Sequence, residues 1–129
     1  MKKSTAGGIA ILVAAVLAAF ALSAQADPAA KWRIEFGSYA RSDGALTLRI
    51  APEGGTPVDV ETKITARSSA DKAARAVRDA LKTSLGAGYD VETDDGEDVI
   101  VRAASKTPKF EVSLGSSTVA GLSVAFHKE

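Results

Sequence analysis

The densest group of chemically active side chains is a set of six acidic residues around Gly96: Asp90, Glu92, Asp94, Asp95, Glu97 and Asp98. Carboxylate oxygens are the ligands that Ca²⁺ prefers in proteins. Side-chain alternation places Asp90, Glu92 and Asp98 on one outer face of a hairpin, and these three are the predicted ligands of a weak Ca²⁺ site. The EF-hand pattern fails, because Asp95 stands where that loop needs glycine and Val101 where it needs glutamate. The alternative is a solvated tip that discourages edge pairing.

A second candidate is the pair Ser69 and Lys72, which has the S-x-x-K spacing of serine acyl-transfer enzymes. The supporting K-T-G and S-D-N motifs are absent from the chain. The stretch 68–71 also supplies an N-cap serine with an acid three residues on, which explains these residues without catalysis. We therefore expect no catalytic residue here, and a small Ser/Lys hydrolase is kept only as an alternative.

Histidine and cysteine chemistry is scarce. His127 is the single histidine, and alternation in its segment directs it away from the core. The chain has no cysteine, which excludes a thiol nucleophile, a disulfide and a thiolate metal site. Apart from the weak Ca²⁺ site, we expect no cofactor.

Two segments rich in turn-forming residues carry the predicted protein-binding residues. The first, residues 37–44, contains Tyr39 and Arg41, and tyrosine and arginine are over-represented at binding hot spots. The second, residues 52–57, contains Glu53 together with two prolines and two glycines. Loops on a rigid β scaffold commonly carry binding residues.

Hydrophobic periodicity predicts the elements that must position these residues. Apolar residues alternate with charged ones in the segments 32–36, 46–50 and 58–64, which indicates three strands of an antiparallel meander. The spacing from Ala70 to Leu85 then changes to that of a helix with a mostly alanine stripe. Four further strands are expected: two in a hairpin with a three-residue loop at 94–96, and one each at 110–114 and 122–126. Gly115–Ser117 is the predicted turn between the last two.

The hairpin register follows from packing. A loop at 94–96 pairs Val91 with Val99 and puts Glu92 directly opposite Asp98, with the apolar residues on one face. The complete order is three strands, one helix and four strands. The sequence therefore predicts an α+β domain, with an antiparallel sheet of about seven strands and one Ala-rich helix packed on it.

The N-terminal segment indicates export. Lys2 and Lys3 precede an apolar run, and Ala24-Gln25-Ala26 matches a small-x-small cleavage site, so residues 1–26 are predicted to be a secretory signal peptide. Residues 27–129 would then form one domain without a membrane span, in the periplasm or secreted. The chain has 16 basic and 16 acidic residues, which argues against nucleic acid as a partner.

These observations favour a non-enzymatic exported module that binds an envelope or extracellular protein, such as an inhibitor or adaptor. The alternative is a structural envelope subunit that assembles through exposed strand edges, with the segment Leu122–Phe126 as a candidate edge.

Overall fold

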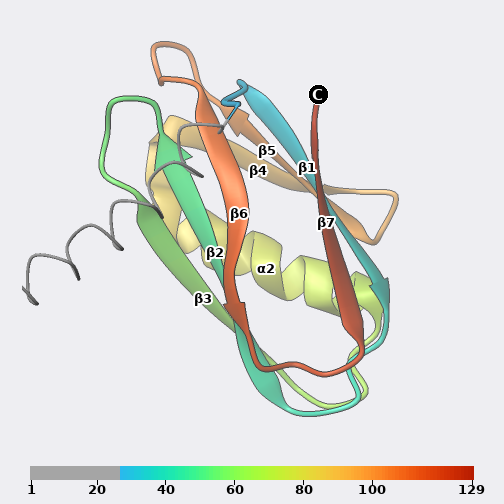
Figure 1. Ribbon diagram of the computed structural model, residues 1–129. Coiled ribbons are helices and arrows are strands. Elements are labelled where there is room, and N and C mark those ends of the chain that lie inside the picture. The colour runs from blue at the N-terminus through green and yellow to red at the C-terminus, as the bar shows by residue number, and fades with distance from the viewer. Residues whose placement is uncertain (1–26) are drawn as a thin grey trace, which may run out of the picture.

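The computed structural model describes residues 27–129, and the predicted signal peptide, residues 1–26, lies outside the described residues. The elements follow in the order β1 (Lys31–Ser38), β2 (Gly44–Pro52), β3 (Val58–Ile64), α2 (Ala70–Leu85), the 3₁₀ turn η1 (Gly86–Gly88), β4 (Tyr89–Asp94), β5 (Asp98–Ala103), β6 (Phe110–Ser117) and β7 (Leu122–Lys128) (Figure 1). The predicted α+β class and the predicted order of strands and helix are confirmed. Within residues 27–129, no helix is long and apolar enough to cross a membrane.

The seven strands form two antiparallel sheets, in the orders β4-β5-β1-β7 and β3-β2-β6. The predicted meander is confirmed for β2 and β3, which pair with each other, but it is wrong for β1, which pairs with β5 and β7 and not with β2. Alternation in a strand specifies which face is buried, but it does not specify the neighbour along the sheet. The sheets meet at one end, where Ala29 and Phe110 exchange two backbone hydrogen bonds of 2.9 Å.

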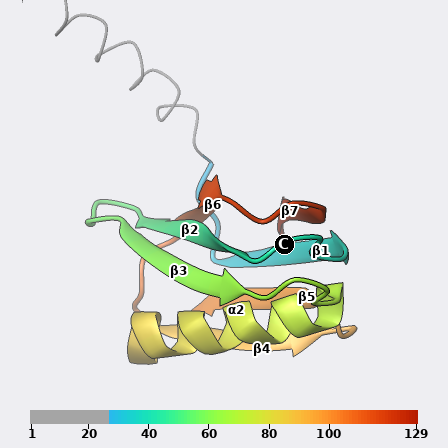
Figure 2. The ribbon, with the colours of Figure 1, turned by 90° about the horizontal axis from the view of Figure 1, so that it is seen from below.

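Helix α2 closes the open side of this arrangement. Figure 2 shows α2 with β4 in one layer and β2 with β6 in the opposite layer. The helix contacts β1, β3, β4 and β5. Its buried stripe consists of small and aliphatic side chains: Ala70, Ala73, Ala74, Val77 and Leu81. The alanines allow the close approach of the helix to the strands that the sequence predicts.

The core lies between α2 and the two sheets. Its largest fully buried side chains are Phe36, Phe110, Ile34, Leu46, Leu48, Ile50, Leu81, Val77, Val99 and Val101. Trp32 is also buried, and its indole Nε1 donates a 2.7 Å hydrogen bond to the Phe110 carbonyl. This bond joins the two sheets where their strands meet.

The predicted register of the β4–β5 hairpin is wrong by two residues. Asp94 lies opposite Asp98 and Val91 opposite Val101, so the loop is 95–97 and not 94–96. A shift of two residues leaves every side chain on its predicted face, so packing could not distinguish the two registers. Asp95 and Gly96 both have positive φ, 54° and 78°, so the left-handed backbone of this loop lies at its first two residues.

The predicted turn at Gly115–Ser117 is also wrong. Strand β6 continues to Ser117, and residues 118–121 form the connection to β7. The pairing with β2 is irregular here: Leu48 lies opposite Leu114, whereas Thr47 lies opposite Ser116. Gly115 is thus the extra residue of a bulge, which is a common place for a glycine inside a strand.

Candidate functional site

Three connections come together at one end of the molecule, and we call residues 39–43, 65–69 and 118–121 the loop end (Figure 1). Backbone hydrogen bonds tie the first connection to the second: Ala40 N donates to Ser68 O at 2.9 Å, and Arg67 N donates to Ala40 O at 2.7 Å. Arg41 N donates to Ala120 O at 2.7 Å, which ties the first connection to the third. The backbone of the loop end is therefore held on both sides of residues 39–43.

Tyr39 and Arg41 lie side by side on this end. Among residues 27–129, Tyr39 is one of three large hydrophobic residues that are exposed, and 49% of its surface is accessible. The guanidinium carbon of Arg41 lies 5.9 Å from the centre of the Tyr39 ring, within the range of a cation–π contact. Ala40 between them is fully buried and anchors the segment. The structure thus presents an aromatic ring and a guanidinium on a fixed backbone.

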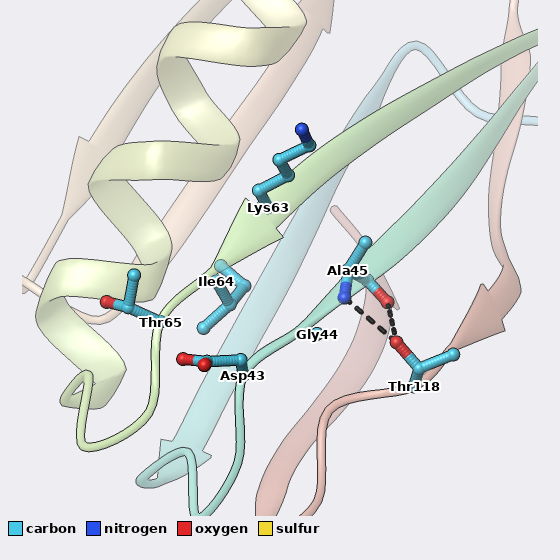
Figure 3. A pocket seen from close by; sticks show the side chains of 7 residues that line it. All are labelled: Asp43, Gly44, Ala45, Lys63, Ile64, Thr65 and Thr118. Atoms are coloured by element: carbon cyan, nitrogen blue, oxygen red, sulfur yellow. Dashed lines mark hydrogen bonds between the residues drawn. The ribbon is translucent and has the colours of Figure 1, made fainter.

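A depression of about 440 Å³ opens in the same region (Figure 3). It is lined by residues from the start of β2, the end of β3 and the two neighbouring connections: Asp43, Gly44, Ala45, Lys63, Ile64, Thr65 and Thr118. Thr118 Oγ1 accepts a 3.0 Å hydrogen bond from Ala45 N. A Cβ on Gly44 would lie 2.8 Å from the Thr118 backbone, so glycine allows this close approach.

The depression has a buried apolar residue and exposed polar groups around it. Ile64 is almost fully buried, whereas Asp43, Lys63, Thr65 and Thr118 are exposed. Asp43 Oδ1 accepts a 2.7 Å hydrogen bond from Ala66 N, which holds the carboxylate in place. Within the described part of the chain, Lys63 makes no ion pair. Sequence reasoning missed this site, because its residues are far apart in the chain and share no pattern.

Glu53 does not belong to the loop end. It lies in the connection between β2 and β3, where its backbone N donates a 2.8 Å hydrogen bond to Lys109 O. Its side chain is exposed. The structure therefore brings together two of the three predicted binding residues, Tyr39 and Arg41, and leaves Glu53 apart from them.

The outer face of the β4-β5-β1-β7 sheet carries a network of charges centred on Arg33. Its guanidinium lies 2.6 Å from Asp98 Oδ2 and 3.0 Å from Asp94 Oδ2, and it also contacts the Glu129 side chain. Hydrogen bonds to Glu129, Asp98 and Asp94 raise the pKa of Arg33. The same hydrogen bond from Arg33 lowers the pKa of Glu129. Arg33 is thus the principal cation among several carboxylates.

The predicted Ca²⁺ ligands Asp90, Glu92 and Asp98 do not form a cluster, and the predicted opposition of Glu92 and Asp98 is wrong. Glu92 lies opposite Ile100, and Asp90 lies opposite Arg102, which it contacts at 3.7 Å. Among residues 27–129, the group that offers three carboxylate oxygens within 4.8 Å of one another is Glu35, Glu97 and Asp98. We call these three residues the acidic trio. Only Asp98 is common to both sets, because the predicted hairpin register was wrong and the pairing of β5 with Glu35 on β1 was not predicted.

Ser69 and His127 both have ordinary structural contacts. Ser69 Oγ accepts a 3.2 Å hydrogen bond from the backbone N of Lys72 and caps helix α2, which moves the cap one residue from the predicted Ser68. The S-x-x-K spacing thus reflects a helix start. His127 Nε2 lies 3.1 Å from Glu35 Oε1, and half of its side chain is exposed. Its outward direction agrees with the prediction.

The chain was compared with known proteins at the level of families and of individual sequences. No protein-family model matches it, and no curated protein matches it. The geometry of the loop end and of the charged sheet face is therefore the basis for inferring the function.

Proposed function

We propose that this protein is a non-enzymatic exported module that binds an envelope or extracellular protein through its loop end. The observation that supports this most is the half-exposed Tyr39 ring, which lies under the Arg41 guanidinium at the end of the molecule where the depression between β2 and β3 opens. Within the described residues, Tyr39 is the aromatic residue among the exposed large hydrophobic ones, and tyrosine and arginine are enriched at interface hot spots.

The rigidity of the loop end favours this role. A loop that is disordered before binding loses conformational entropy when a partner orders it, and this loss weakens the complex. Residues 39–43 are bonded to both neighbouring connections by backbone hydrogen bonds of 2.7–2.9 Å. Tyrosine adds contact area with few rotatable bonds. The loop end therefore resembles a preorganised binding surface.

The depression indicates the chemistry of the partner. An apolar side chain of the partner would contact Ala45 there, and an acceptor such as a carboxylate would meet the ammonium group of Lys63. The hydroxyls of Thr65 and Thr118 lie on the lining and are able to exchange hydrogen bonds with a peptide backbone. We infer a folded protein partner with a protruding loop that carries an apolar and an acidic residue.

Assembly through strand edges is the second candidate. Both β6 and β7 are edge strands. On β7 the residues Leu122, Val124 and Phe126 are only partly buried, and Leu114 on β6 is 42% exposed. An unprotected edge with apolar side chains is a template for pairing with another strand. This candidate predicts association of the protein with itself, whereas the first predicts a different protein as the partner.

Affinity capture tests the proposal. Purified protein is immobilised and exposed to envelope extract, in three forms: the natural chain, the double variant Tyr39→Ala with Arg41→Ala, and the matched control Glu53→Ala. We expect the natural chain and the control to retain the same partner in stoichiometric amount and the double variant to lose it. Truncation of hot-spot residues typically costs about 2 kcal/mol or more each, so the purified partner should bind the double variant at least about 100-fold more weakly.

Two results would contradict the proposal. If the double variant retains the partner with unchanged affinity, the loop end is not the contact surface. If the immobilised protein retains only further copies of itself, assembly through β6 and β7 replaces the proposed function. Circular dichroism of the three forms provides the necessary check that each one is folded.

A further inference from the structure

We propose that the acidic trio, Glu35, Glu97 and Asp98, binds a Ca²⁺ ion on the outer face of the β4-β5-β1-β7 sheet. The three residues come from β1, from the β4–β5 loop and from the first position of β5. Each offers one carboxylate oxygen, and the three oxygens lie within 4.8 Å of one another. A single ion at the centre of such a group is able to contact all three carboxylates.

Asp98 provides an independent observation. Only 8% of its surface is accessible, and its Oδ1 is buried without any hydrogen-bond partner among the described residues. Its other oxygen, Oδ2, contacts Arg33 at 2.6 Å. A buried carboxylate oxygen without a partner is costly, because it has lost water and gained no donor in return. A cation bound beside the Asp98 carboxylate would satisfy this atom.

The pairing of the strands concentrates negative charge at this place. Asp98 lies directly opposite Glu35 on β1 and directly opposite Asp94 on β4. Like charges in facing positions of an antiparallel pair are destabilising. Arg33 contacts both Asp94 and Asp98, and His127 contacts Glu35. Arg33 also contacts Glu129, so its guanidinium is shared among Asp94, Asp98 and Glu129, and Asp98 is the member of the trio that it contacts. The three carboxylates of the trio therefore keep an excess of negative charge.

The chemistry of the trio favours Ca²⁺ over other ions. Its ligands are all carboxylate oxygens, which suit hard cations, whereas zinc and copper sites normally include histidine or cysteine. Glu35 and Glu97 are exposed, so water is able to complete the coordination sphere. Ca²⁺ accepts variable geometry with six to eight oxygen ligands, whereas Mg²⁺ demands a near-ideal octahedron. The trio, with two exposed carboxylates and one buried one, therefore fits Ca²⁺ better.

Calorimetric titration of the purified protein with CaCl₂ tests the inference without any protein partner, so its outcome is separate from that of the proposed function. We expect one ion per chain, with a Kd on the order of 10⁻⁴–10⁻³ M, which is typical of extracellular modules. Glu97→Gln should weaken binding at least about tenfold, because it removes a carboxylate from the trio. The exposed Glu97 side chain makes this variant safe for the fold, and the Glu97 backbone bonds to Phe36 and Asp95 remain.

Asp90→Asn is the matched control, because Asp90 is an exposed carboxylate of the same hairpin outside the trio. The Asp90→Asn variant should bind Ca²⁺ with an affinity within about twofold of that of the natural chain, since it loses only a charge that lies outside the trio. Three results would overturn the inference: no binding at about 10 mM CaCl₂, an equal loss in Glu97→Gln and Asp90→Asn, or equal affinity for MgCl₂. The second would indicate general attraction of cations to an acidic surface.

Discussion

Gly121 shows how single residues shape the loop end. Its φ is 89°, and a Cβ added to it would lie 2.8 Å from the Tyr39 carbonyl oxygen and 3.0 Å from two atoms of the Arg41 side chain. Only a residue without Cβ allows the third connection to lie this close to the first. The exposure of Tyr39 and the position of Arg41 therefore depend on a glycine that contributes no side chain to binding.

This dependence yields a prediction for stability. Gly54 has a similar φ of 73°, but a Cβ there would meet nothing within 4 Å, so Gly54→Ala isolates the backbone strain. That strain is about 1–2 kcal/mol for a left-handed residue with a Cβ. We expect Gly121→Ala to reduce the free energy of unfolding by at least about 1 kcal/mol more than Gly54→Ala, because it adds a steric conflict. Urea unfolding measures both, and equal losses would show that residues 118–121 move without cost.

At the scale of elements, helix α2 starts at a defined cap. Ser69 Oγ accepts the hydrogen bond from Lys72 N, and Asp71 in the first turn interacts favourably with the helix dipole. Ser69→Ala should reduce the free energy of unfolding by about 1 kcal/mol, and Ser69→Asp should restore most of it, because aspartate also accepts this bond. Thermal or urea unfolding provides the measurement. If both variants lose equally, capping is not the role of Ser69.

The periodicity of the sequence was sufficient to predict elements but not their partners. The stripe from Ala70 to Leu81 indicated the helix and its buried face, and the alternation of Trp32, Ile34 and Phe36 indicated β1. Nothing in β1 distinguishes β2 from β5 as its neighbour, because both present similar apolar faces. In the same way, Val91 faces the core in either hairpin register. The acidic trio depended on both of these choices, which is why the sequence suggested a different set of ligands.

At the scale of the whole molecule, the two proposed sites are built from different elements. The loop end is built from connections at the ends of β1, β3 and β6, whereas the acidic trio lies on the outer sheet face beside the β4–β5 loop. Tyr39 and Arg41 could be proposed from their residue types alone. The depression beside them could not, because residues 43–45, 63–65 and 118 become neighbours only when the β3-β2-β6 sheet forms.

The most direct test of the loop end as the binding surface is hydrogen–deuterium exchange of the backbone amides, with and without the captured partner. Buried contact with a partner slows the exchange of the amides that it covers. We predict added protection in residues 39–45, 63–69 and 118–121, with no change in residues 52–57. Protection confined to Leu122–Lys128 or to residues 52–57 would contradict the account and place the interface on an edge strand or at the Glu53 connection.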